Sequence, residues 1–381
     1  MQMRPQPFQI DIGDADIAEL HTRLARTRLP TPLELQPQGE GIDPAFLRRL
    51  LRHWAVGFDW RTHEARLNLL PQFRAQIGEQ LIHFIHVRGK GPSPMPLVLT
   101  HGWPGSFLEL EALIPLLSDP AAYGGDAADS FDVVVPSLPG FGFSNAPTRP
   151  GTGSYEVAAL WCDLMNGLGY ERFGAQGGDL GAGVTAWLGQ RFPERVIGMH
   201  LSYIPGSYRP PMGAGCSPIL DEEQQFLDRA AGFSDTNGAY ARLQSTKPYT
   251  LAVGLNDSPA GLAAWIAEKF HAWSDDFEAT IGLDKLLANI SLYWFTGTIG
   301  SSFRMYVEGR ARPLHLSGRI QPPMGAAIFP AELPMPPRTW VERGFDVRHW
   351  NHMPAGGHFA AIEQPALLAE DIRVFFRALR T

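Results

Sequence analysis

Cysteine is scarce in this chain of 381 residues, which has only Cys162 and Cys216. Two cysteines in a chain of this length do not make a disulfide framework, so we expect a protein of the reducing cytoplasm. A run of about 18 apolar residues, which a membrane-spanning helix needs, is also missing. The first residues are polar and lack the apolar core of a signal peptide. The sequence therefore predicts a cytoplasmic protein that does not engage a membrane.

Positive charge is also in short supply. The 32 Lys and Arg residues are outnumbered by 39 Asp and Glu residues, giving a net charge of −7, and no segment gathers the basic residues into a cluster. Nucleic-acid binding requires a basic surface, so we expect no nucleic-acid partner. No His, Cys and carboxylate cluster has metal-ligand spacing, so we expect neither a metal nor another cofactor. The sequence leaves the oligomeric state open, a homodimer included.

The first part of the chain is predicted to be a helical extension. Asp14 is expected to cap a helix whose apolar positions Ile17, Leu20 and Leu24 recur at helical spacing. Asp43-Pro44 predicts the start of a second helix, with proline at its first position. We assign residues 1–92 to this extension together with the first strand of the core.

A change of pattern follows at about residue 79, where short apolar runs alternate with helical stretches. This alternation is typical of a parallel sheet covered by helices. The predicted strands are 81–87, 96–100, 131–135, 173–176, 196–201, 325–329 and 345–350. Residues 207–318 interrupt the pattern with helical stretches at 222–231, 259–270 and 283–294. We therefore predict an α/β fold in two parts, 93–206 and 319–381, separated by a helical cap at 207–318 and ending in a helix at 365–379.

The strongest local motif is Gly177-Gly178-Asp179-Leu180-Gly181, between a predicted strand and a predicted helix. Small residues on both sides of a central reactive residue are typical of the nucleophile elbow of α/β-hydrolases. Serine hydrolases have Ser at the centre, whereas this chain has Asp179. A carboxylate attacks an alkyl carbon and forms an ester that water can later cleave. Taken alone, the motif also allows Asp179 to be a simple helix cap.

A second motif, His101-Gly102-Trp103-Pro104-Gly105, follows the predicted strand 96–100. In α/β-hydrolases this loop supplies one amide of the oxyanion hole, and the residue after the nucleophile supplies the other. We therefore predict that the amides of Trp103 and Leu180 stabilise the oxyanion during ester hydrolysis. A glycine turn with a cis X-Pro bond is the structural interpretation of the same motif, and the two are compatible.

The candidate base is His358, which follows Gly356-Gly357 in a loop before the last helix. The order Asp, acid, His along the chain matches that of α/β-hydrolases. Glu332 lies just after the predicted strand 325–329, where this fold places the acid that orients the imidazole. Asp346 is the alternative acid, but it falls inside a predicted strand.

These motifs resemble the epoxide hydrolases of the microsomal type, including their bacterial and fungal members, over nearly the whole chain. The resemblance rests on the strings His101–Phe107, Pro136–Ser144, Gly177–Gly181, Gln244–Pro248, Leu255–Pro259, Tyr293–Ile299 and Gly356–Ala361. It implies two cap tyrosines that donate hydrogen bonds to the epoxide oxygen, and the matching positions are Tyr240 and Tyr306. A phenol with a pKa of about 10 can protonate the alkoxide that an opening epoxide forms.

The sequence thus predicts hydrolysis of a small-molecule epoxide to a diol, with water as the second substrate. One alternative is a haloalkane dehalogenase, which shares the Asp nucleophile. That family typically has Trp after the nucleophile, where this chain has Leu180. The other alternative is a non-catalytic carrier of small molecules on the same fold, which the complete set of candidate residues disfavours.

Overall fold

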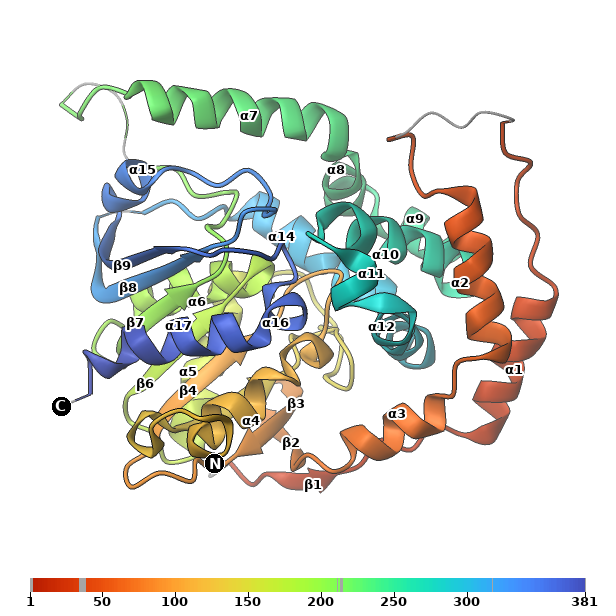
Figure 1. The fold of residues 1–381 in the computed structure, drawn as a ribbon, viewed down its shortest axis with the longest axis horizontal. Coiled ribbons are helices and arrows are strands. Elements are labelled where there is room, and N and C mark those ends of the chain that lie inside the picture. The colour runs from red at the N-terminus through yellow and green to blue at the C-terminus, as the bar shows by residue number, and fades with distance from the viewer. Residues whose placement is uncertain (1–2, 34–38, 211, 213–214, 317, 381) are drawn as a thin grey trace.

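The computed structural model describes residues 3–33, 39–210, 212, 215–316 and 318–380. The strands are β1 (Gln6–Phe8), β2 (Gln72–Ile77), β3 (Gln80–Val87), β4 (Met95–Thr100), β5 (Phe131–Pro136), β6 (Phe173–Gly177), β7 (Val196–Leu201), β8 (Ile320–Ile328) and β9 (Phe345–His352). They form a single sheet in the order β1-β2-β3-β5-β4-β6-β7-β8-β9 (Figure 1). Strands β1, β2, β3 and β5 pair antiparallel, and all pairs from β5 to β9 are parallel.

The helices that precede β7 in the chain are α1 (Asp14–Ala25), α2 (Pro44–Val56), α3 (Trp60–Leu67), α4 (Leu113–Ser118), α5 (Ser154–Gly167) and α6 (Asp179–Arg191). Those between β7 and β8 are α7 (Asp221–Asn237), α8 (Ala239–Thr246), α9 (Pro248–Asp257), α10 (Pro259–Trp273), α11 (Phe277–Thr280), α12 (Gly282–Thr296), α13 (Ile299–Ser302) and α14 (Arg304–Ala311). The last are α15 (Arg338–Glu342), α16 (Ala360–Glu363) and α17 (Pro365–Arg377).

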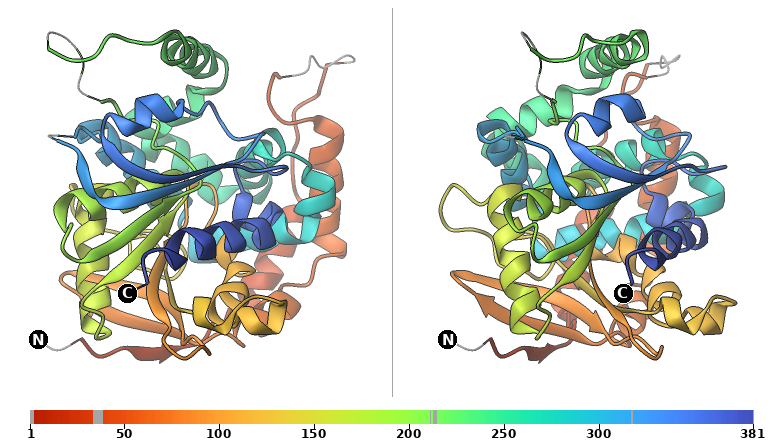
Figure 2. Two further views of the ribbon diagram at one scale, coloured as in Figure 1. Left: turned by 60° about the vertical axis from the view of Figure 1, so that its left-hand side comes forward. Right: turned by 90° about the vertical axis from the view of Figure 1, so that its left-hand side faces the viewer.

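The parallel part of the sheet is the core of the molecule. Strand β5 is buried along its whole length, and Val98 of β4 pairs with Val134 of β5 and Ala175 of β6. Such continuous burial is expected where helices cover both faces of a parallel sheet. Helices α4 and α17 lie on one face, and α5 and α6 lie on the other (Figure 2). The predicted α/β fold, with a mostly parallel sheet, is confirmed.

Two predictions about local structure were wrong. The region before residue 79 contains β1 and β2, which the sequence did not indicate, because β1 is short and β2 has little apolar alternation. Asp14 is the first residue of α1, whose N-cap is Gly13 without a side-chain cap. By contrast, Asp43 caps α2 as expected by accepting from Phe46 N at 2.6 Å.

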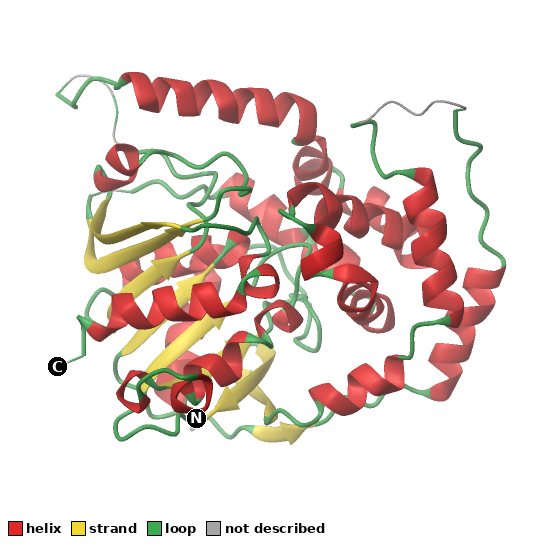
Figure 3. Cartoon of the chain, viewed as in Figure 1, coloured by secondary structure: helices red, strands yellow, loops and turns green. Residues whose placement is uncertain are grey.

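Helices α7 to α14, named here the helical insertion, separate β7 from β8, and no described residue between these two strands forms a further strand (Figure 3). The predicted stretches 222–231, 259–270 and 283–294 correspond to α7, α10 and α12. The short helices α8 and α14 were not foreseen from the sequence. The limits of the cap and of the two core parts stay predictions.

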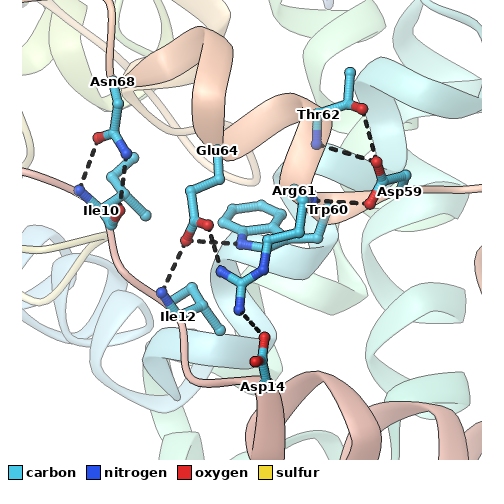
Figure 4. Close-up of polar contacts among 9 residues, drawn as sticks. All are labelled: Ile10, Ile12, Asp14, Asp59, Trp60, Arg61, Thr62, Glu64 and Asn68. Carbon is cyan, nitrogen blue, oxygen red and sulfur yellow. Dashed lines mark hydrogen bonds and ion pairs between the residues drawn. The ribbon is translucent and has the colours of Figure 1, made fainter.

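The N-terminal arm is fixed to α3 by polar contacts (Figure 4). Asn68 accepts from Ile10 N and donates to Ile10 O, both at 2.8 Å. Glu64 accepts from Ile12 N at 2.8 Å and from the indole of Trp60 at 3.2 Å. Arg61 joins Glu64 to Asp14 at the start of α1. The arm therefore has a defined path beside α3, which sets the position of α1.

Helices α1 and α2 pack against the helical insertion. Figure 1 shows them beside α10 and α12, on the side away from the sheet. The buried Trp54 of α2 donates its indole N–H to Ser291 of α12 at 2.9 Å. The N-terminal extension therefore holds α12 from outside. Among the described residues no helix is long and apolar enough to cross a membrane, and none of their His, Cys and carboxylate side chains form a metal-binding group.

Candidate active site

The sharp turn between β6 and α6 carries Asp179. Its φ is 46°, the only positive φ among the described residues other than glycine. A Cβ on Gly177 would lie 2.3 Å from the backbone of Gly181, and a Cβ on Gly181 would lie 2.0 Å from Thr100 O. Glycine is therefore required on both sides of Asp179. The strained backbone is typical of an elbow that presents its central side chain at the end of a strand.

The carboxylate of Asp179 turns toward the loop after β4. Asp179 Oδ1 accepts from Trp103 N at 2.8 Å, and α6 has no side-chain cap, so Asp179 does not cap its own helix. The peptide bond between Trp103 and Pro104 is cis. Leu180 N, the second predicted oxyanion amide, makes no hydrogen bond to Asp179 in the described structure. It lies in the first turn of α6, where helix amides lack intrahelical partners.

The helical insertion fixes this loop. Asn289 of α12 donates to Pro104 O at 2.7 Å, and Tyr293 Oη donates to Gly105 O at 2.8 Å. Both side chains are buried. The position of the Trp103 amide therefore depends on α12 as well as on the sheet.

His358 lies in the loop between β9 and α16, beside Asp179. Its Nε2 is 3.5 Å from Asp179 Oδ2, and its Nδ1 is 2.5 Å from Glu332 Oε1. The side chains of His358 and Glu332 are only 2% exposed. The alternative acid Asp346 lies in β9 and pairs instead with Arg319 and Arg348 at 3.3 and 2.8 Å.

The loop that carries His358 is anchored to the helical insertion. His358 N donates to Trp273 O at the end of α10 at 2.9 Å. Gly356 N donates to Asp275 at 2.9 Å, and Asp275 N donates to Glu363 of α16 at 2.8 Å. The imidazole is therefore oriented by the backbone on one side and by Glu332 on the other.

The charges around His358 determine its protonation. Burial alone lowers the pKa of an imidazole, but the carboxylates of Glu332 and Asp179 outweigh burial and hold the pKa of His358 well above its usual value. Both carboxylates therefore favour the protonated form of this imidazole. Loss of the negative charge on Asp179 would lower its pKa again.

Tyr240 of α8 and Tyr306 of α14 face Asp179 from the helical insertion. Their rings are 5.9 Å apart and lie 5.4 and 5.7 Å from the ring of Trp103. Burial raises the pKa of both phenols, and the charge of Asp179 adds to this effect. Both hydroxyls therefore carry their protons at neutral pH. The structure thus brings the predicted residues from the core and the cap to one place, while their roles stay predictions.

Two further residues of α10 belong to this group and were missed from the sequence. The Lys269 ammonium lies 4.7 Å from the centre of the Tyr240 ring and 5.5 Å from that of Trp273. Trp273 also packs against His358, with the ring centres 5.1 Å apart. A charged Glu268-Lys269 pair inside an apolar helix was the signal available in the sequence. Lys269 is paired with Glu268 at 2.5 Å, and the charge of Glu268 is among the causes that raise the pKa of Tyr240.

The site can now be compared with known proteins. The family description "Epoxide hydrolase N terminus" matches residues 5–110, and "alpha/beta hydrolase fold" matches residues 95–256. Epoxide hydrolase 1 of Oryctolagus cuniculus is 36% identical over 97% of this chain and 88% of its own length. This chain belongs to the epoxide hydrolase family.

Other relatives agree with this assignment. A Stigmatella aurantiaca protein is 43% identical to this epoxide hydrolase, over 98% of this chain and 85% of its own length. The structure of Aspergillus niger epoxide hydrolase superposes with a TM-score of 0.87 at 32% identity, covering 100% of this chain and 97% of that one. The family predicted from the motifs is therefore confirmed, and the chain is an enzyme that hydrolyses epoxides.

Proposed function

We propose that this epoxide hydrolase converts an epoxide to a vicinal diol in two steps, through an ester on Asp179. The observation that carries the proposal is the position of this carboxylate. Asp179 Oδ1 is held by the Trp103 amide, Oδ2 lies beside His358, and both tyrosine rings pack against the ring of Trp103. One oxygen is therefore fixed as a future carbonyl oxygen, and the other is free to attack.

In the first step Asp179 Oδ2 forms a bond to one epoxide carbon, and the bond between that carbon and the ring oxygen breaks. The ring oxygen takes a proton from Tyr240 or Tyr306. Because both phenols have raised pKa values, they are protonated and able to donate before the reaction begins.

In the second step water cleaves the ester. Alkylation removes the charge of Asp179, which is one of the two carboxylates that raise the pKa of His358. The pKa of His358 therefore falls in the ester, and the histidine can act as the base that activates water. Glu332 orients the imidazole, and the amides of Trp103 and Leu180 stabilise the tetrahedral oxyanion.

The test is a single turnover of styrene oxide in ¹⁸O-labelled water with enzyme in excess. The diol from the first turnover should contain unlabelled oxygen from Asp179, and the label should enter the peptide that carries Asp179. A second turnover of the recovered enzyme in ordinary water should release label into the diol. Label found wholly in the first diol would exclude the covalent route.

The two tyrosines are expected to act in the first step only. Tyr306→Phe and Tyr240→Phe should each slow ester formation by about 10²-fold, because a proton donor to the leaving oxygen is lost. The rate of ester hydrolysis should stay nearly unchanged. Stopped-flow tryptophan fluorescence with styrene oxide separates the two rates.

Tyr249→Phe is the matched control, since Tyr249 lies on the insertion but is 83% exposed. This variant should match the wild type in both rates. A tyrosine variant that slows ester hydrolysis as strongly as ester formation would contradict the assignment of the pair to the first step.

The cellular context is part of the same proposal. Cys162 and Cys216 are both free thiols, which supports a place in the reducing cytoplasm. The excess of acidic residues supports a small-molecule epoxide and water as partners rather than nucleic acid. Leu180 in place of Trp after Asp179 favours an epoxide over a haloalkane as the substrate.

A further inference from the structure

A small internal cavity lies against Asp179. Its volume is about 20 Å³, and its walls include Glu109, Gln176 and His358. One water molecule needs roughly 10–15 Å³ of such space and usually makes about three hydrogen bonds to buried polar groups. The cavity therefore has room for one water molecule next to the predicted nucleophile and base.

Gln176 contributes a polar group to this cavity that the protein leaves unsatisfied. It is the third residue before Asp179, near the end of β6, and it is 1% exposed. Its Oε1 atom has no hydrogen-bond partner among the described residues. A buried polar atom without a partner is costly, and its residue lines a cavity large enough for water, so the two observations together indicate a ligand with hydrogen-bonding capacity.

Glu109 lies on the 3₁₀-helix η1 (Phe107–Leu110) and is tied to the predicted oxyanion loop. Its Oε1 accepts from Gly102 N at 3.2 Å, the residue before the Trp103 amide that binds Asp179. Burial, and then the charge of Asp179, raise the pKa of Glu109 to about 8, while His358 acts in the opposite sense. A carboxyl oxygen accepts hydrogen bonds in both protonation states, so Oε1 of Glu109 can accept a second one.

We propose that Glu109 and Gln176 hold the hydrolytic water against His358 during cleavage of the ester. This inference rests on the proposed ester on Asp179. The water donates one hydrogen to His358 Nε2 and shares the other between the two acceptors Glu109 Oε1 and Gln176 Oε1. A lone pair of the water oxygen then faces the ester carbon of Asp179.

The arrangement accounts for each bond of the second step. The water oxygen bonds to the ester carbon, and its proton moves to His358 Nε2. The bond between the ester carbon and the alkyl oxygen then breaks, and the proton on His358 passes to the departing alkoxide to give the diol. Asp179 regains a carboxylate with one oxygen from water. Glu109 and Gln176 exchange no proton and act by position alone.

The test compares Glu109→Leu with Glu109→Gln in stopped-flow experiments with styrene oxide. Glu109→Leu should leave the rate of ester formation within about 3-fold of wild type but slow ester hydrolysis by roughly 30-fold, because a hydrogen bond to the attacking water is lost. Glu109→Gln keeps an acceptor oxygen and should restore hydrolysis to within about 3-fold of wild type. A merely structural role would slow both steps or neither.

Glu111→Gln is the matched control. Glu111 is two residues away, pairs with Arg66 at 3.2 Å, and does not line the internal cavity. Both of its rates should match the wild type. Gln176→Met provides an independent variant of similar shape, and it should also slow hydrolysis selectively.

Mass spectrometry of the quenched proteins separates this inference from the function on which it rests. If Glu109→Leu and Gln176→Met form the ester on Asp179 and hydrolyse it at the wild-type rate, the proposed role of Glu109 and Gln176 in holding the water is wrong. The covalent route would remain intact. Absence of any ester in the wild type and in all variants would instead overturn the covalent route itself.

Discussion

Asp179→Ala is expected to abolish turnover of epoxides, with a loss of roughly 10⁵-fold or more, as for other nucleophiles that act within a catalytic triad. The variant has no carboxylate to form the ester, and the neighbouring His358 and tyrosines cannot replace it. Diol formation from styrene oxide measures the loss. No covalent adduct should appear by mass spectrometry at any time.

The same variant should change the protonation of His358. The negative charge of Asp179 favours the imidazolium form, so its removal should lower the pKa of His358 toward the value of an ordinary histidine. NMR titration of the imidazole in wild type and variant measures this shift. An unchanged pKa of His358 in the variant would contradict this electrostatic effect of Asp179.

Asp346→Asn is the control for the loss of a carboxylate. Asp346 is held by Arg319 and Arg348 in β9, and its replacement should leave turnover near that of the wild type. Retention of diol formation by Asp179→Ala within 100-fold of wild type would exclude Asp179 as the nucleophile.

The hydrophobic pattern was sufficient to predict the parallel core. Strands such as β4 and β5 are buried on both faces, so their sequences are continuous apolar runs that local patterns reveal. Strand β8 begins at Ile320, earlier than expected, because Pro322 and Pro323 hide it and the pairing register shifts there. Strand β2 escaped detection because it lies near the edge of the sheet and alternates weakly.

The candidate site was predictable where its residues lie on motifs of the core. Asp179 and His358 follow glycines that stand out in the sequence, and a Cβ on Gly177 or on Gly357 would collide with backbone in the folded chain. The tyrosines differ, since Tyr240 and Tyr306 lie on short helices without a strong apolar period. Their proximity comes from the packing of α8 against α14, which local patterns do not encode.

Glu109 and Gln176 could not be predicted from the sequence for a different reason. Each lies in a segment whose local pattern was correctly predicted or unremarkable, and neither belongs to a motif of reactive residues. Their importance comes from a shared cavity of about 20 Å³ between η1, β6 and the loop of His358. Such a cavity depends on the relative positions of three distant segments, so only the folded structure reveals it.

His358→Gln is expected to stop the reaction at the ester. Alkylation by Asp179 does not require a base, so ester should form in a burst of one equivalent. Its hydrolysis should slow by about 10³-fold, because water then lacks a proton acceptor. The intact mass of the protein should rise by the mass of the epoxide and stay raised. Slow decay of this species should yield diol.

The exposed His352 at the end of β9 provides the matched control, and His352→Gln should turn over like the wild type. Rapid steady-state turnover by His358→Gln would remove His358 as the base. Glu332 contacts Nδ1 of His358, the ring nitrogen that faces away from Asp179. Glu332→Gln should therefore give a milder form of the same defect. Its ester should accumulate less and decay faster than the ester of His358→Gln. This order of severity follows from the geometry, since the base contacts water directly whereas Glu332 acts on water only through the imidazole.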